Sequence, residues 1–216
     1  MAPSEYVVES YSGDINKDRF IINEYGVLGH TYDDDQKRNI ERKMNFVYVG
    51  RVCLEKGIMR LIDLAERIKN NKLIEINIVG PIDQNVMTII KSLKLKNIHF
   101  HGAKPKKDIK TYLKAADCMI MPSLSDAYCI AVIEALSVGV PVIVSSRTGC
   151  KDIVVKNDLG FVFDVDDVEQ LESTVLAYQE LPLVEINHYK ERIRSYFKSE
   201  SDNSYLDRLI SIYNKL

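Results

Sequence analysis

Short apolar runs alternate with helix-like patterns along most of the chain, from Asn45 to about residue 180. Between the runs, apolar residues recur every three or four positions, as they do on one face of an amphipathic helix. The runs have the length of buried strands and lie at residues 46–49, 74–79, 98–100, 118–121, 140–144 and 160–163. Buried strands that alternate with helices predict a parallel sheet covered on both faces. With right-handed crossovers, this is a doubly wound, Rossmann-like α/β sheet of about six strands, with 160–163 at an edge.

The two ends of the chain differ from this middle part. Residues 1–44 contain a short apolar run at 20–22 and then a polar stretch with three aspartates at 33–35, which is typical of a linker. Residues 186–197 and 205–213 are amphipathic helical patterns that no strand follows. Their apolar faces must pack on the sheet layer or on another part of the protein.

Charge and cysteine content narrow the class of protein. The chain has 29 basic and 31 acidic residues, a net charge of −2, and no long run of one sign. A general nucleic-acid binder would carry a basic stripe, so we do not expect one here. The four cysteines form no CxxC pair and fit reduced thiols in the cytosol. We therefore expect a cytoplasmic protein, with peripheral contact at the inner face of the membrane left open.

Parallel sheets of this kind bind ligands at the carboxyl ends of their strands, so the loops after the strands are the places to inspect. The loop after the first strand carries Gly50, Arg51 and Lys56 just before a helical pattern. Two cations beside the start of a helix favour a bound phosphate. The loop lacks the Gly-Lys-Ser/Thr of a Walker sequence. A surface turn with two solvated cations is the alternative interpretation.

The loop after the fourth strand contains Asp126 and leads into a helical pattern that contains Glu134. Apolar neighbours predict that Glu134 is nearly buried, which is costly for a carboxylate unless it accepts hydrogen bonds. A ribose diol would supply two such donors, and Asp126 lies where it can reach a ligand at the helix N-terminus. In the alternative interpretation, Asp126 caps the helix and Glu134 pairs with a nearby cation.

Three further features have weaker functional interpretations. In the loop after the fifth strand, Gly149 and Asp152 can face the same pocket, although Asp152 fits a helix cap equally well. His99 and His101 lie on one side of a strand, but no Cys, Asp or Glu stands at ligand spacing, so we expect no metal site. A position near a helix N-terminus suggests a lowered thiol pKa for Cys129, but no nearby His can act as its base.

Taken together, these loops resemble those of the group 1 glycosyltransferases, retaining enzymes of family four with the GT-B architecture of two Rossmann-like domains. Residues 50–51 and 56–57 match the Gly-Arg-(four residues)-Lys-Gly loop of that family. Asp126 and Glu134 match its two acids separated by seven residues, since 134 − 126 = 8. The similarity covers residues from about 45 to 181 and continues through 115–117, 121–123, 139–143, 149 and 152–154.

The resemblance implies roles for the charged residues. Arg51 and Lys56, in the loop that Gly50 opens, would hold the donor diphosphate and neutralise its charge. Glu134 would bind the ribose, and Asp126 would face the donor sugar. Catalysis would then depend on Asp126, Arg51 and Lys56.

The resemblance also implies contacts from the backbone and the absence of a cofactor. Amides around Tyr128, Cys129 and Ile130 would contact the sugar or the phosphates, and Lys104 would lie near the nucleobase. The donor would be a nucleotide-diphosphate sugar, bound without a metal ion or other cofactor, and its sugar would be transferred with retention at the anomeric carbon.

Some positions depart from the family pattern. Asp126 stands where the family usually has Glu, Ala127 and Cys129 stand where it usually has glycine, and Ala131 replaces a common proline. Asp152 also replaces a Glu. We expect the added side chains to tighten the space around the donor sugar.

By this resemblance the chain is the C-terminal half of a GT-B enzyme. Residues 1–44 would be a remnant of the N-terminal acceptor domain and the interdomain linker. Residues 45–181 would form the nucleotide-sugar-binding domain, and 182–216 the closing helices. Such a chain would be inactive alone, because the missing N-terminal domain binds the acceptor.

The implied activity is transfer of a sugar to a glycan or lipid-linked acceptor in the synthesis of cell-surface polysaccharides or glycoconjugates. The alternatives are a non-catalytic nucleotide-sugar-binding subunit, or another enzyme of the same fold such as a nucleotide-sugar epimerase. A glycogen-type phosphorylase would need a pyridoxal lysine, for which no sequence context is recognisable. The base, the sugar and the acceptor are not specified by the sequence.

Overall fold

The computed structural model describes residues 1–11, 16–24, 43–199 and 204–214 of the chain. The predicted linker with its three aspartates at 33–35 lies outside these residues.

One parallel sheet forms the centre of the molecule, with the strand order β3-β2-β1-β4-β5-β6. This confirms the doubly wound sheet that the alternating pattern predicts, including 160–163 at an edge. Between β1 and β4 the chain changes direction across the sheet, which makes this pair the switch point where such folds bind ligands. The strands are β1 Met44–Val49, β2 Ile74–Val79, β3 Ile98–Phe100, β4 Cys118–Met121, β5 Val142–Ser145 and β6 Gly160–Phe163.

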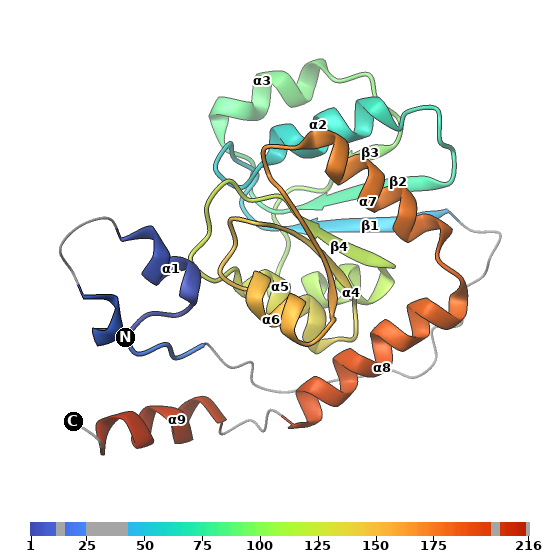
Figure 1. The fold of residues 1–216 in the computed structure, drawn as a ribbon. Coiled ribbons are helices and arrows are strands. Elements are labelled where there is room, and N and C mark those ends of the chain that lie inside the picture. The colour runs from blue at the N-terminus through green and yellow to red at the C-terminus, as the bar shows by residue number, and fades with distance from the viewer. Residues whose placement is uncertain (12–15, 25–42, 200–203, 215–216) are drawn as a thin grey trace.

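Helices cover both faces of the sheet (Figure 1). On one face lie α2, α3 and α7, and α2 and α7 are joined by an ion pair between Arg67 and Glu172 at 3.4 Å. On the other face lie α4, α5 and α6. The bounds are α2 Ile58–Arg67, α3 Gln84–Ser92, α4 Lys106–Ala115, α5 Ile130–Ser137, α6 Lys151–Lys156 and α7 Val168–Glu180.

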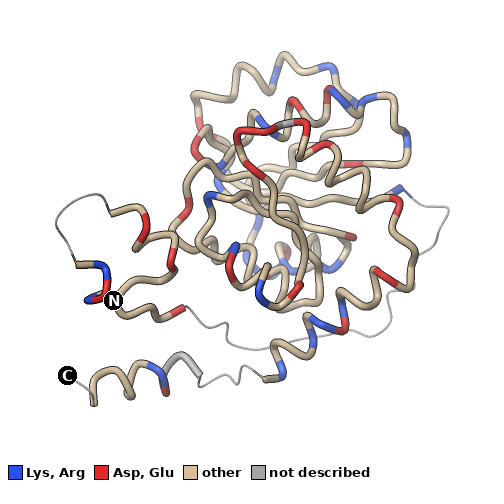
Figure 2. The backbone as a smooth tube through the Cα atoms, in the orientation of Figure 1, with Lys and Arg blue, Asp and Glu red and all other residues tan. Residues whose placement is uncertain are grey.

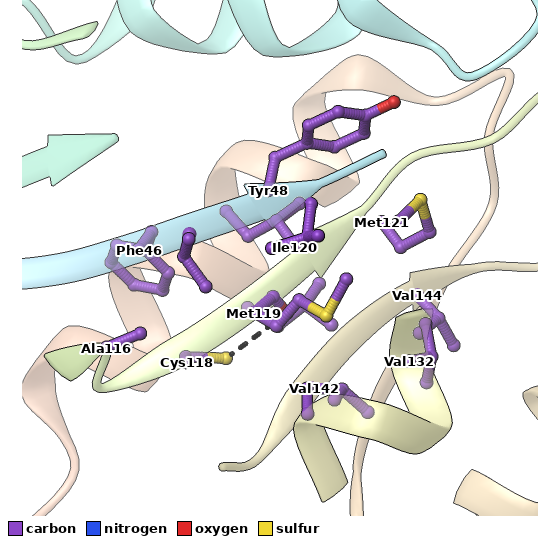
Figure 3. Packing of buried hydrophobic residues seen from close by; sticks show 14 of the residues in the cluster. Phe46, Tyr48, Ala116, Cys118, Met119, Ile120, Met121, Val132, Val142 and Val144 are labelled. Carbon is purple, nitrogen blue, oxygen red and sulfur yellow. Dashed lines mark hydrogen bonds between the residues drawn. The ribbon is translucent and has the colours of Figure 1, made fainter. Parts of the chain in front are cut away.

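The central strands are buried on both faces, as their continuous apolar sequences require. Side chains of β1, β4 and β5 pack with Val132 of α5 (Figure 3), and Phe46 and Met119 are fully buried. Tyr178 of α7 meets the ring of Phe46 edge-on at 5.9 Å and donates a hydrogen bond to the carbonyl of Asp117. Each large apolar side chain buried in this way contributes roughly 1.5–3 kcal/mol.

The two ends of the chain add further helices, α1 Glu5–Ser10, the 3-10 helix η1 Lys17–Arg19, α8 Leu183–Ser199 and α9 Ser204–Tyr213. The apolar face of α8 buries Ile186, Ile193 and Phe197, and α8 contacts α5. This part of the closing region therefore packs on the sheet layer itself. The apolar run at 20–22 forms only an isolated bridge, between Ile22 and Ala2.

Acidic and basic residues are distributed over all the elements, with no single-signed stripe along the described chain (Figure 2). Within the same described residues, no helix is both long enough and apolar enough to cross a membrane.

Candidate functional site

The loops that follow β1 and β4 lie against each other at the switch point. The amide of Leu124 donates to the carbonyl of Glu55 at 2.8 Å. Gly57, with φ +74°, approaches the second loop so closely that an added Cβ would stand 1.8 Å from the carbonyl oxygen of Pro122. Only glycine fits this approach and this left-handed backbone. The Lys-Gly pair therefore has a packing reason as well as a chemical one.

The start of the first loop is held from below. The hydroxyl of Tyr48 donates to the carbonyl of Arg51 at 2.7 Å, and burial raises the pKa of this hydroxyl far above its ordinary value. The guanidinium of Arg51 lies 3.5 Å from Glu55, and both side chains are more than half exposed. Such an exposed pair contributes about 0–1 kcal/mol, so Arg51 can turn toward a ligand at little cost.

Lys56 joins the two loops. Its ammonium donates to Oδ2 of Asp126 at 2.8 Å, and the two side chains are only 23% and 15% exposed. Burial by itself lowers the pKa of Lys56, but the hydrogen bond and the charge of Asp126 outweigh it, and the pKa is raised. The sequence therefore predicted correctly that these residues belong to one site, although it did not predict that they pair with each other.

The other oxygen of Asp126 caps the turn that leads into α5. Oδ1 accepts hydrogen bonds from the amides of Tyr128 at 3.2 Å and Cys129 at 2.8 Å. Aspartate favours this local turn because its short side chain reaches back to nearby amides. The capping interpretation of Asp126 is thus confirmed. Two of the amides that the resemblance assigns to the donor are occupied by Asp126 in this structure.

Cys129 precedes α5 in a left-handed conformation, with φ 64° and ψ 71°. This explains why glycine is usual here in the family, because an L side chain in this region costs about 1–2 kcal/mol. A hydrogen bond with Cys150, together with burial, raises the pKa of the Cys129 thiol well above its ordinary value. The hypothesis of a lowered thiol pKa is therefore wrong, and Cys129 is no nucleophile in this structure.

Glu134 is more accessible than its sequence pattern predicted. Its side chain is 33% exposed, and Oε1 lies 3.9 Å from the ammonium of Lys106, which is itself 93% exposed. The expectation of a nearly buried acid is wrong, because α5 turns an open side outward on which Ile130 is also exposed. At this distance and exposure the pair with Lys106 is weak, so a ligand hydroxyl can compete for the carboxylate.

The nucleobase side of the site is the loop after β3, which contains Lys104. His101 lies at its start and pairs through Nε2 with Oδ1 of Asn77 at 2.6 Å. Burial, together with the positive charges of His99 and Lys104, lowers the pKa of His101. Among the described residues, no three His, Cys, Asp or Glu side chains are grouped so that they could hold a metal ion.

The loop after β5 supports the site from its other side. The amide of Asp126 donates to the carbonyl of Arg147, and that of Gly149 donates to the carbonyl of Asp126 at 2.9 Å. Asp152 is not the helix cap, since Cys150 holds that position of α6. Burial raises the pKa of Asp152, and its Oδ2 has no hydrogen-bond partner among the described residues.

A segment that the sequence did not connect with the site also reaches it. The hydroxyl of Ser4 donates to the carbonyl of Ala127 at 2.6 Å, and Tyr6 reaches Ser125. No local pattern could have indicated these contacts, because the partners lie 123 and 119 residues apart.

Comparison with known proteins agrees with this arrangement. The family model described as glycosyl transferases group 1 matches residues 31–198, which is well over half of the chain. The chain belongs to the group 1 glycosyltransferases. The predicted family and the predicted fold class are both confirmed.

Similar proteins include the putative colanic acid biosynthesis glycosyltransferase WcaL of Escherichia coli K12. It is 23% identical over 175 residues, which are 76% of this glycosyltransferase chain and 43% of WcaL. Among solved structures, WaaG, a glycosyltransferase involved in lipopolysaccharide biosynthesis, matches with a TM-score of 0.66 and 21% identity over 80% of this chain and 47% of WaaG. S. aureus TarM, in complex with UDP and glycan ligands, matches with a TM-score of 0.76 and 16% identity over 94% of this chain and 40% of TarM. The chain thus spans less than half the length of these proteins.

Proposed function

We propose that the chain is the donor-binding domain of a retaining glycosyltransferase that takes its sugar from a nucleotide-diphosphate sugar. The observation that carries this proposal is the Lys56–Asp126 pair, which joins the two switch-point loops at 2.8 Å. It places a partly buried cation and the sugar-facing acid of the family motif at one point. The acceptor would be a glycan or lipid-linked glycan of a cell-surface polysaccharide or glycoconjugate. Support for this comes from WcaL and WaaG, which are named for such pathways.

Charge complementarity supports a diphosphate beside these loops. Lys56 is held near the start of α2, and Arg51 can turn toward a ligand. Each charge-assisted hydrogen bond to a phosphate contributes about 1.5–3 kcal/mol. Cations fixed in this way stabilise the negative charge that develops on the departing nucleoside diphosphate. We therefore expect binding and transfer to proceed without a divalent metal ion.

The order of groups along the site supports the assignment of the remaining parts of the donor. Lys104 and Glu134 lie on the β3 and α4 side, where they would contact the base and the ribose. Lys56 and Arg51 would follow at the diphosphate, and Asp126 at the sugar. Because Asp126 pairs with Lys56 in this structure, the donor phosphates must share or take over that ammonium when they bind.

Transfer also requires an acceptor hydroxyl held beside the anomeric carbon. In two-domain enzymes of this architecture the other domain supplies that surface, and such positioning is worth roughly 7–11 kcal/mol of the barrier. We therefore expect these 216 residues alone to hydrolyse the donor slowly at best. Addition of an acceptor domain should be needed for transfer.

Titration calorimetry with UDP, GDP, ADP and one sugar of each base tests the binding proposal directly. UDP is the natural first probe, since TarM was solved with it. We expect one base to bind equally well with and without a chelator of divalent cations. Arg51→Ala and Lys56→Ala should each weaken binding by about tenfold or more, which corresponds to about 1.4 kcal/mol.

Lys72→Ala is the matched control. Lys72 is an exposed cation between α2 and β2, at the opposite edge of the sheet, so its loss changes the net charge equally. Failure of every nucleotide to bind would refute the proposal. So would a Lys72 variant that weakens binding as much as the Lys56 variant, because the effect would then reflect net charge alone.

A non-catalytic nucleotide-sugar-binding subunit is the second candidate. The engagement of both Asp126 oxygens favours it, because such an acid is held by the protein rather than presented to a substrate. Donor hydrolysis separates the two candidates. A slow release of sugar that Asp126→Ala abolishes supports the enzyme, and tight donor binding with no release, even when an acceptor domain is added, supports the subunit.

A further inference from the structure

The short helix α1 is attached to the loop that contains Asp126. Ser4 precedes the helix, is 1% exposed, and donates its hydroxyl to the carbonyl of Ala127 at 2.6 Å. The contact is close on all sides, since a Cβ added to Gly149 would stand 2.4 Å from the same Ser4 oxygen. Figure 1 shows α1 at the edge of the sheet where the strands end. The N-terminal segment is therefore part of the wall of this edge.

Contacts with α6 set the orientation of α1. Glu5 pairs with Lys156 at 3.4 Å and, one turn later, Glu9 pairs with Lys151 at 3.9 Å. The ammonium of Lys151 also lies 5.9 Å from the centre of the Tyr6 ring. Each of these exposed contacts is weak alone, but together with buried Ser4 they define which side of α1 faces the loop.

This orientation brings the hydroxyl of Tyr6 to 3.2 Å from Oγ of Ser125, the residue directly before Asp126. The pair is exposed, in contrast to the buried Ser4 contact, so the fold gains little from it. Each hydroxyl can both donate and accept, and the tyrosine adds a ring with an apolar face. Paired hydroxyls beside an aromatic ring are suited to the hydroxyl groups and the apolar faces of a sugar.

We infer that Tyr6 and Ser125 contact the transferred sugar of the donor and contribute to its selection. This inference rests on the proposed function, because Asp126 is the sugar-facing acid only in that function. It gives residues of the segment 1–44 a place in the donor site, in addition to any role in an acceptor domain. The bare nucleoside diphosphate would not reach this pair.

The test compares UDP with UDP-glucose by calorimetry, or GDP with GDP-mannose or ADP with ADP-glucose if those bases bind. The variants are Tyr6→Phe and Ser125→Ala, each of which removes one hydroxyl. We expect unchanged affinity for the bare diphosphate, and a loss of about two- to tenfold in affinity for the sugar-bearing donor, the value for one neutral hydrogen bond. Tyr11→Phe, in the same segment with its ring on Phe20, is the matched control and should change neither affinity.

The outcomes separate this inference from the proposed function. If the nucleotides bind but both variants keep the wild-type preference for the sugar-bearing donor, the inference is wrong and the proposed function stands. Equal losses for both ligands, accompanied by a lower melting temperature, would show that the pair is structural and would also overturn the inference. If no nucleotide binds to the wild-type chain, both fail.

Discussion

Replacement of Asp126 by asparagine should tighten the binding of a nucleoside diphosphate. Asparagine keeps an oxygen that can accept from the amides of Tyr128 and Cys129, so the turn before α5 is retained. It removes the charge that holds Lys56. The ammonium would then have the phosphates as its strongest available partner, and the repulsion between the carboxylate and the phosphates would disappear.

The magnitude follows from the geometry of the pair. A charge-assisted hydrogen bond at 2.8 Å between side chains that are 23% and 15% exposed contributes about 1.5–3 kcal/mol. If the donor had to give up this whole amount, the wild-type affinity would be reduced about 10- to 100-fold. Because an ammonium has three donors and can be shared, we expect a gain near the lower end, about tenfold. The same lost pair should lower the melting temperature by about 2–4 °C for each kcal/mol.

The assay is calorimetric titration of wild-type and Asp126→Asn chains with the nucleoside diphosphate that the base panel selects, together with thermal unfolding of both. Asp63→Asn is the matched control, since it removes a carboxylate from an ion pair with Arg67 on the outer surface of α2. That variant should change the affinity less than twofold. Weaker binding by Asp126→Asn, or unchanged binding with a lowered melting temperature, would refute the idea that Asp126 competes with the phosphates for Lys56.

Three further predictions concern stability and are measured by thermal or chemical unfolding. Cys129→Gly should be about 1 kcal/mol more stable than Cys129→Ala although it removes more atoms, because only glycine relieves the left-handed strain; equal stabilities would contradict this. Gly57→Ala should destabilise by more than about 2 kcal/mol, because its Cβ would overlap the Pro122 carbonyl; a change within about 0.5 kcal/mol would show that the loops can separate. Burial lowers the pKa of His101, so the folded chain binds fewer protons and should lose stability as the pH falls below the ordinary value near 6.5. His101→Gln should reduce this pH dependence, and an unchanged slope would assign it to other groups.

The sequence by itself was sufficient for the class of fold and for the family. Strands such as Cys118–Met121 are continuously apolar because both faces of a parallel sheet are buried, and this is visible in a few neighbouring residues. The Gly-Arg and Lys-Gly pairs and the two spaced acids are equally local. They could be recognised without a structure because their spacing along the chain is what the chemistry of a loop and a helix requires.

Only the tertiary structure decided how these groups meet. Lys56 and Asp126 are 70 residues apart and become a pair because β4, the fourth strand in the chain, is the neighbour of β1. The occupied amides before α5 and the strained backbone of Cys129 follow from that packing. Helical periodicity placed Glu134 among apolar residues, but it could not show that one end of α5 remains open.

The largest addition made by the fold is the N-terminal segment at the site. The contact between Tyr6 and Ser125 spans 119 residues and depends on a buried serine hydroxyl and on ion pairs with α6. None of these groups forms a pattern along the chain, because each is selected by a partner that is close only in space. Local sequence determines which elements form, and the packing of those elements determines which side chains share a surface.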